Sequence, residues 1–294
     1  MMQVASREPS TLATHPCPSC TGGRDQVRMQ LDFLPDFSPE MQLVRCLACG
    51  TERINPRPHA AALAEQYDED YYREGYLPFE EQRRADFRLR LAELERLPAV
   101  QRARQEQRAP RCLDIGAGVG LFALEALACG WQVTAVEPSS AARDLASRRW
   151  DLELAADWPA PEQVFDVVTF WDVLGHVEEP GAMLEAAGLR LQRGGSLVMK
   201  IPNFRSTWHR SRTWMSGRRR ANLLHAPTVI WRFHRQGAMR LLARHGFVLA
   251  GARTLREPDL IPLTPRWRAV RVVTDLLDGL LDNRQEMVLH ARQR

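Results

Sequence analysis

Hydrophobic and polar residues alternate along residues 110–294 with two different periods, one typical of strands and one typical of helices. Short apolar runs are followed by segments with apolar residues every three or four positions, and the cycle then repeats. The predicted strands are 111–116, 131–138, 165–174, 196–203, 248–255 and 285–292. The predicted helices between them are 120–130, 139–150, 180–195 and 236–247. This alternation predicts an α/β fold, Rossmann-like and doubly wound, with a mostly parallel sheet covered by helices on both faces.

Three segments depart from this alternation. Residues 59–109 have helical spacing of apolar residues from Phe79 onwards, and we expect a helical linker or lid there. Residues 204–235 are basic and aromatic and interrupt the strand–helix order. Residues 266–281 have an apolar stripe that we expect to pack against the core, with contact to a membrane surface as the alternative. The residues of this stripe are Trp267, Val270, Val273, Leu277 and Leu280.

Charge and hydropathy exclude some classes of protein. The net charge is +4, but Lys200 is the only lysine, and such an arginine excess is more typical of a biased coding composition than of nucleic-acid binding. No apolar run approaches the roughly 18 residues that span a bilayer, and residues 1–17 lack the apolar core of a secretion signal. We therefore expect a cytoplasmic protein without a transmembrane segment.

Four of the six cysteines form two CxxC pairs, separated by 25 residues. In a chain expected to be cytoplasmic, this spacing favours a structural zinc ion held by four thiolates, with unmetallated thiols as the alternative. The ligands would be Cys17, Cys20, Cys46 and Cys49. We expect residues 1–15 to be disordered and residues 16–58 to form a small zinc-ribbon-like module.

A glycine-rich stretch, LDIGAGVG at 113–120, connects the first predicted strand to a helix. Its GxGxG spacing fits neither the usual dinucleotide loop nor a nucleoside-triphosphate loop. Glu137 follows Gly120 by 17 residues and closes the next strand, where a carboxylate accepts hydrogen bonds from ribose hydroxyls. Asp114 is expected to accept backbone amides of the loop and to face the cationic end of a ligand.

Together, LDIGAGVG, AVEPS, AADW, FDVVTFWDVLGHVEEP and LQRGGSLVMKIPN resemble class I S-adenosylmethionine-dependent methyltransferases over residues 108–203. The cysteine pairs, NPRP and YDEDYY resemble a subgroup with an N-terminal zinc-binding domain, which includes sugar C-methyltransferases and enzymes of specialised metabolism. The resemblance implies a seven-stranded sheet, a methyltransferase domain over 110–294, and an insertion at 204–235 that covers the acceptor pocket.

The resemblance also implies how S-adenosylmethionine would be bound. Asp114 and the three glycines would hold its amino acid part, Glu137 its ribose, and Asp157 with Trp158 its adenine. A plain turn or strand end is the alternative reading at these positions. The full set of predicted cofactor residues is Asp114, Gly116, Gly118, Gly120, Glu137, Asp157, Trp158 and Trp171.

His176 is the predicted catalytic residue, because it follows the fourth strand and a histidine titrates near neutral pH. It would act as a general base, and the alternative is a fixed hydrogen-bonding role. Gly175 stands where the family usually has glutamate, which weakens the transfer of the subgroup's acceptor chemistry to this chain.

The predicted activity is methyl transfer to oxygen or carbon of a small-molecule acceptor. The acceptor would be a sugar, nucleotide-linked sugar, polysaccharide or natural-product intermediate. For residues 218–220, three arginines, we favour a solvated basic loop, with contact to a phosphate on the acceptor as the alternative. An RNA methyltransferase is one alternative, but the amino-nitrogen motif and the Pro-Cys nucleophile of such enzymes are missing from the sequence. A non-catalytic zinc-containing partner protein with a methyltransferase fold is the other. The sequence does not predict an oligomeric state.

Overall fold

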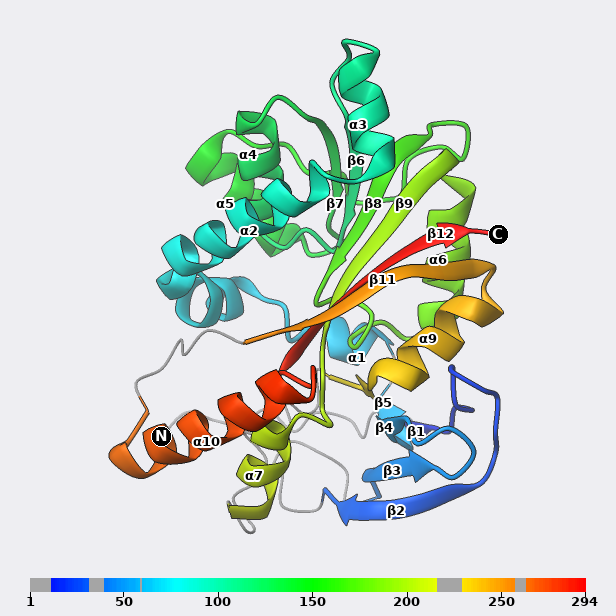
Figure 1. The fold of residues 1–294 in the computed structure, drawn as a ribbon, viewed down its shortest axis with the longest axis vertical. Helices are drawn as coiled ribbons and strands as arrows, with labels where there is room; N and C mark the ends of the chain where they lie inside the picture. Colours follow the sequence, from blue (N-terminus) through cyan, green and yellow to red (C-terminus); the bar gives the residue numbers. More distant parts are fainter. Residues whose placement is uncertain (1–11, 32–39, 59, 216–228, 257–262) are drawn as a thin grey trace.

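A central sheet lies between two layers of helices, with a smaller sheet at one end of the molecule (Figure 1). The computed structural model describes residues 12–31, 40–58, 60–215, 229–256 and 263–294. Most of the N-terminal segment expected to be disordered therefore lies outside the described residues. The same holds for the three arginines at 218–220 and for much of the 204–235 insertion.

The central sheet has six strands, in the order β11–β12–β9–β8–β6–β7. Strands β6 to β9 are parallel, and β12 and β11 are added antiparallel at one side. Their bounds are β6 Arg111–Ile115, β7 Gln132–Val136, β8 Phe165–Trp171, β9 Leu191–Pro202, β11 Phe247–Leu255 and β12 Glu286–Gln293.

The prediction of seven strands was wrong by one. At the β7 edge, a single parallel bridge between Val136 and Ala155 stands where a seventh strand was expected. The segment 151–164 contains Pro159 and Pro161, which cannot donate hydrogen bonds to a ladder, and it contains four carboxylates. This composition limits strand pairing at that edge to one bridge.

Helices cover both faces of the sheet, as predicted. On one face, Val167 and Trp171 of β8 pack with α2 to α5, and on the other, Val168 and Phe170 pack with α1, α6 and α9. The bounds are α1 Ala60–Ala64, α2 Glu80–Leu94, α3 Pro98–Gln105, α4 Leu121–Ala128, α5 Ser140–Trp150, α6 Pro180–Leu189 and α9 Arg235–Arg244. Every residue of β8 is buried, as expected for a central strand with both faces covered.

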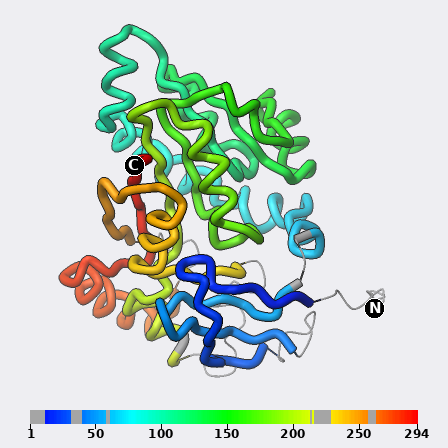
Figure 2. Tube along the Cα trace, turned by 90° about the vertical axis from the view of Figure 1, so that its right-hand side faces the viewer, coloured from blue at the N-terminus to red at the C-terminus, as the bar shows by residue number. Residues whose placement is uncertain are grey.

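The cysteine-containing segment and strand β10 together form a four-stranded antiparallel sheet, in the order β10–β4–β3–β2. The N-terminal part of this module is drawn in blue at the bottom of the molecule in Figure 2. Strand β10 comes from a part of the chain 175 or more residues away from the other three. The bounds are β2 Asp25–Gln30, β3 Gln42–Cys46, β4 Glu52–Ile54 and β10 Trp231–Arg232, and a separate pair is formed by β1 Leu12–Ala13 and β5 Arg57–Pro58. Strand β10 therefore lies within the cysteine module, although in the sequence it falls between strands β9 and β11 of the central sheet.

Side chains of the core also bind the second CxxC turn directly. The backbone carbonyls of residues 48–50 accept hydrogen bonds from Arg240 at 3.1 Å, His234 at 3.0 Å and Arg205 at 3.4 Å. His234 is 4 % exposed, and its burial lowers its pKa, which favours the neutral imidazole that this contact uses. The module and the core are consequently joined by a shared strand and by three donors to one turn.

Helices α7 (Thr207–Met215) and α10 (Pro265–Leu280) pack together away from the central sheet (Figure 1). The expectation that the apolar stripe of α10 packs against the core is wrong from Val273 onwards, although Trp267 at its start contacts the buried Trp208 of α7, with ring centroids 5.8 Å apart. Val273 is 57 % exposed and Leu280 is 85 % exposed. None of the described helices is both long enough and apolar enough to cross a membrane.

Candidate functional site

The glycine loop lies where β6 ends, at the carboxyl edge of the parallel strands (Figure 1). Gly116, Gly118 and Gly120 all have positive φ, at 67°, 58° and 79°. A Cβ on Gly116 would lie 2.6 Å from Val173, and one on Gly120 would lie 2.4 Å from Leu152. A Cβ on Gly118 would have no neighbour closer than 3.8 Å. The first and third glycines thus allow close packing, and the middle one leaves the loop surface open.

Glu137, at the end of β7, holds this loop in place. Its two carboxylate oxygens accept the backbone N–H of Gly118 at 2.8 Å and that of Ser139 at 2.9 Å. We had expected Asp114 to accept the loop amides, and this was wrong, because Asp114 instead accepts the hydroxyl of Thr169 at 2.7 Å. Asp114 precedes the turn and points across to β8, whereas Glu137 ends the neighbouring strand directly beside the loop.

Asp114 has the most unusual environment of the predicted ligand residues. Its side chain is 1 % exposed, and its Oδ2 has no hydrogen-bond partner among the described residues. Burial, with a smaller effect of the Glu137 charge, raises the pKa of Asp114 to about 7, against the lowering effect of Thr169. A buried carboxyl with one unpaired oxygen beside an open glycine loop fits a cationic ligand group such as an ammonium.

Trp171 supplies a second unpaired polar atom on the same face of the sheet. Its ring packs against Phe87 and Phe122, with centroids 5.9 and 5.1 Å away. Its indole Nε1 is buried and has no hydrogen-bond partner among the described residues. The ring is therefore part of the core, while its N–H is a donor that a ligand can use.

The two residues predicted to hold an adenine are less closely tied to the loop. Asp157 is exposed and lies two residues beyond Ala155, which bridges β7 next to Glu137. Trp158 packs against the core on the side of α6, and the Arg190 guanidinium lies 5.1 Å from its ring centroid. The structure places both residues at the β7 edge without a recorded contact to the glycines.

All four tyrosines of the chain gather over this edge, in the segment that precedes α2. Consecutive rings contact edge to face, with centroids 5.1, 5.0 and 6.1 Å apart from Tyr67 through Tyr71 and Tyr72 to Tyr76. Tyr72 and Tyr76 are the nearest side chains to the open position above Gly118. Burial raises the pKa of all four hydroxyls, so they remain neutral donors at physiological pH. We call these four residues the tyrosine lid.

The tyrosine lid is joined to both sides of the site through Tyr67. Its hydroxyl lies 2.8 Å from Nδ1 of His176, and its backbone carbonyl accepts the Ser139 hydroxyl at 2.8 Å. Ser139 is the N-cap of α5 and binds Glu137 through its own N–H. One lid residue therefore connects the predicted base with the carboxylate predicted to bind ribose.

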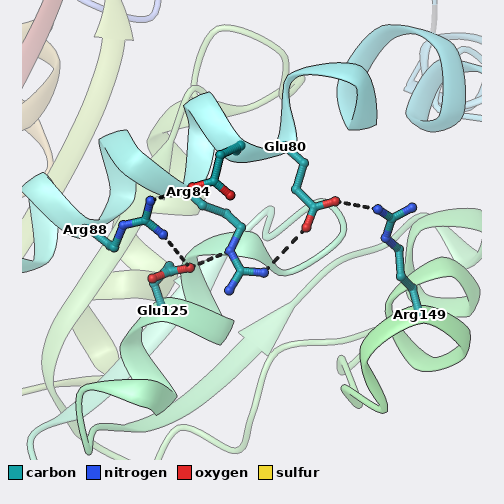
Figure 3. A network of polar contacts seen from close by, with 6 residues as sticks. Glu80, Arg84, Arg88, Glu125 and Arg149 are labelled. Atoms are coloured by element: carbon teal, nitrogen blue, oxygen red, sulfur yellow. Dashed lines mark hydrogen bonds and ion pairs between the residues drawn. The ribbon is translucent and has the colours of Figure 1, made fainter.

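Ion pairs fasten the helix that follows the lid (Figure 3). Arg84 and Arg88 of α2 reach Glu125 of α4 at 2.6 and 3.4 Å, and Glu80 of α2 binds Arg149 of α5 at 2.7 Å. Glu125 is 6 % exposed, so its charge is compensated mainly by these two guanidinium groups. The predicted lid over 59–109 is thereby held against the two helices that follow the glycine loop and Glu137.

The loop that carries His176 is held from the opposite side by β10. The carbonyl oxygen of Gly175 accepts the N–H groups of Ile230 at 2.9 Å and Trp231 at 3.0 Å, and the Trp231 indole donates to the carbonyl of Val177 at 2.8 Å. A Cβ on Gly175 would lie 3.2 Å from the backbone oxygen of Trp231. The glycine at the family's glutamate position is therefore explained by the close approach of β10.

The only lysine of the chain lies in β9 among three carboxylates, an arrangement that the sequence did not predict. Lys200 Nζ is 2.9 Å from Asp172, 3.1 Å from Glu286 and 4.0 Å from Asp86. Burial alone would lower its pKa, but these three carboxylates raise it overall. Asp172 has a positive φ of 61°, which brings its carboxylate back toward β9. The signal available in the sequence was a single lysine among 40 basic residues.

The four cysteines predicted as metal ligands are brought together. Their sulfur atoms all lie within 4.8 Å of one another, with 3.4 Å between Cys17 and Cys49 and 3.5 Å between Cys20 and Cys46. A tetrahedral zinc ion with bonds of about 2.3 Å requires sulfur atoms about 3.8 Å apart. The cluster therefore fits a four-coordinate soft cation, and its ligands leave no position for a catalytic water.

The pKa of Asp114 gives a prediction for stability. Because the folded carboxyl keeps its proton up to about pH 7, whereas an unfolded one loses it near about pH 4, Asp114 lowers stability increasingly across that interval. Asp114→Asn should remove this loss, so its free energy of unfolding relative to wild type rises by up to about 4 kcal/mol from pH 4 to 7. Urea unfolding of both proteins at several pH values measures this, and a difference independent of pH would contradict it.

Comparison with known proteins agrees with this geometry. Among solved structures, the chain is similar to one in the complex between the Haloferax volcanii Trm112 methyltransferase activator and the putative methyltransferase. The TM-score is 0.55 at 16% identity, over 76% of this chain and 96% of that chain. It is also similar to a SAM dependent methyltransferase from Archaeoglobus fulgidus, with a TM-score of 0.50 at 17% identity, over 75% and 100% of the two chains. At these identities the likeness shows the fold alone, and no curated protein matches the chain in sequence.

The family is shown by sequence. A family model described as a methyltransferase domain matches residues 79–250, which is more than half of the chain and spans α2, the glycine loop, Glu137 and His176. The strand order and the loop at the end of β6 agree with that match. The chain therefore belongs to the class I S-adenosylmethionine-dependent methyltransferases.

Proposed function

We propose that this chain transfers a methyl group from S-adenosylmethionine to an oxygen or carbon atom of a small-molecule acceptor. The observation that carries the proposal is the buried Asp114 carboxyl with a free oxygen, next to an open glycine loop roofed by the tyrosine lid. The cofactor supplies a methyl group that is already electrophilic, so the protein mainly has to position the acceptor and exclude water.

The residues present fit the parts of that cofactor. Asp114 would bind its ammonium group and the glycines would let its amino acid part approach the backbone, while Glu137 would accept hydrogen bonds from its ribose hydroxyls. Asp157 and Trp158 at the β7 edge are proposed to hold the adenine. The unpaired indole N–H of Trp171 is proposed as a further donor to the bound cofactor.

His176 is proposed as the general base that removes a proton from the acceptor. In the tautomer whose Nδ1–H donates to the Tyr67 hydroxyl, Nε2 is the acceptor nitrogen of the neutral imidazole, which is the form that a general base requires. Because Tyr67 stays neutral, it orients the imidazole without adding a charge. The acceptor is proposed to be a sugar or a natural-product intermediate, free or linked to a nucleotide.

The donor half of the proposal is tested by binding of S-adenosylhomocysteine, measured by isothermal titration calorimetry. Gly118→Ala should weaken binding by about tenfold or more, because its methyl group would occupy the surface where the ligand lies. Gly130→Ala is the matched control, since Gly130 also has a positive φ, of 75°, with open space around it at the far end of α4. Both changes should cost similar stability, about 1 kcal/mol. If the wild-type protein does not bind S-adenosylhomocysteine, the result would favour a non-catalytic partner protein instead.

The acceptor half is tested with methyl-labelled S-adenosylmethionine and a panel of free sugars, nucleotide-linked sugars and RNA. With the acceptor so found, His176→Ala should lower kcat by about 100-fold or more and leave the Kd for S-adenosylhomocysteine unchanged. Tyr67→Phe should lower kcat by less than His176→Ala does, and its pH–rate profile should still show the ionisation of His176. Full turnover by His176→Ala would show that His176 is not the general base. Methyl label found only in RNA would show that the acceptor is RNA and not a small molecule.

The cysteine module is proposed to hold one structural zinc ion and to place the chain in the zinc-containing subgroup. Metal analysis of purified protein should give one zinc per chain, and Cys46→Ser should lose it, whereas Cys129→Ser, outside the cluster, should not. Because β10 pairs with β4 and binds Gly175, loss of the metal should also speed amide hydrogen exchange in residues 172–178. If metal-free protein shows the same amide hydrogen exchange in residues 172–178 as the metal-loaded protein, a structural role of the zinc ion is contradicted.

A further inference from the structure

Helix α10 is amphipathic in the inverse sense, with polar side chains inside and apolar side chains outside. Its three buried residues are Arg271, Thr274 and Asp278, at 3, 4 and 0 % exposure. Its outer surface has six exposed apolar residues, which we call the α10 face. These are Val272 at 61 %, Val273 at 57 %, Leu276 at 66 %, Leu277 at 44 %, Leu280 at 85 % and the adjoining Leu281 at 69 %.

The rotation of α10 that produces this face is fixed by its buried polar contacts. Asp278 accepts the backbone N–H groups of Thr207 at 2.7 Å and Trp208 at 3.2 Å, and so caps the first turn of α7. On the turns before it, the Arg271 guanidinium lies 4.6 Å from the centroid of the Trp208 ring. Turning the leucines inward would break this cap and remove the Asp278 carboxylate from the two α7 N–H groups. The outward orientation of the apolar residues is therefore built into the packing of the two helices.

The exposed charges in the first turn of α10 are cationic, and the exposed carboxylate that follows the α10 face, Asp282, is ion-paired with Arg235 at 2.8 Å. Arg266 and Arg268 are the exposed charged residues within the helix. Its two carboxylates are withdrawn from solvent, since Asp278 is buried and Asp275 is ion-paired with Arg256 at 2.7 Å. The described part of α10 thus presents an apolar strip with a cationic end.

The dimensions of the strip distinguish between occupants. A helix of 16 residues is about 24 Å long and about 10 Å wide, so one face offers about 250 Å². A stable protein interface needs about 800 Å² from each partner, which is about three times what one face of α10 offers. An anionic lipid surface accepts a single helix face, because acyl chains cover the apolar side chains and the headgroups pair with arginine.

We propose that the α10 face binds the surface of an anionic lipid bilayer, with α10 lying parallel to the membrane plane. Leu276, Leu277 and Leu280 enter the boundary between headgroups and acyl chains, and Arg266 and Arg268 contact the lipid phosphates. The neighbouring helix α7 exposes Trp214 at 81 %, a residue type enriched at membrane interfaces. The binding is peripheral, and it is independent of the proposed methyl transfer.

The test is flotation of the full-length, metal-loaded protein with vesicles of phosphatidylcholine alone or with about 30% phosphatidylglycerol. We expect binding to the anionic vesicles that weakens with salt, and little binding to phosphatidylcholine alone. The double variant Leu276→Glu/Leu280→Glu should reduce partitioning by about tenfold or more. Arg266→Gln and Arg268→Gln should each reduce it by about fivefold.

Leu189→Glu is the matched control, because Leu189 at the end of α6 is 67 % exposed and lies outside the α10 face. It should bind vesicles as wild type does. Circular dichroism and unfolding midpoints establish that each variant is folded. Absence of binding to anionic vesicles, or equal loss in the Leu189 control, overturns the proposal. The proposal is also overturned if light scattering shows that the wild type is a dimer and the double variant a monomer, and the wild type does not bind lipid.

Discussion

The hydrogen bonds from Ile230 and Trp231 to the carbonyl oxygen of Gly175 are the contact on which the arrangement of the site depends. Trp231 and the following Arg232 form β10, which pairs with β4, so the cysteine module, β10 and the His176 loop form one continuous hydrogen-bonded layer. Because Gly175 has no side chain, the two backbones can approach to this distance. The position of the proposed base is thereby set by a segment more than 50 residues after it, which is itself paired with a strand more than 100 residues before it.

The opposite wall of the site is set by the tyrosine lid. Tyr67 contacts His176 and Ser139, and Ser139 contacts Glu137. Movement of the lid therefore alters the surroundings of the proposed base and of the carboxylate proposed to bind ribose. The ion pairs of α2 with α4 and α5 hold the lid's C-terminal end in place. The proposed acceptor site therefore lies between the tyrosine lid, whose end is held by ion pairs, and the His176 loop, which is held by backbone hydrogen bonds.

The features that sequence reasoning found are those encoded within a few residues. The strand–helix periods, the GxGxG loop and the CxxC spacing are local patterns, and they lie where the sequence predicted them, except that the helix predicted over 180–195 ends at Leu189 and β9 begins at Leu191. The errors concern contacts between distant segments: Glu137 rather than Asp114 binds the loop, β10 joins a sheet 175 residues away, and the stripe of α10 faces outward. Periodicity gives the angle between apolar residues on a helix but not the direction in which that face points. For α10 this direction is decided by Asp278, whose role as a cap depends on a helix elsewhere in the chain.

Strand β10 has a consequence for recombination between relatives. Since three strands of the small sheet precede the core in sequence and the fourth follows the His176 loop, a cut after residue 58 does not separate two folding units. A chimaera that exchanges residues 16–58 alone would present a foreign edge strand to Trp231 and foreign carbonyls to His234 and Arg240. Productive grafts would have to carry residues 229–245 together with the module, so the two segments are expected to be inherited as one block.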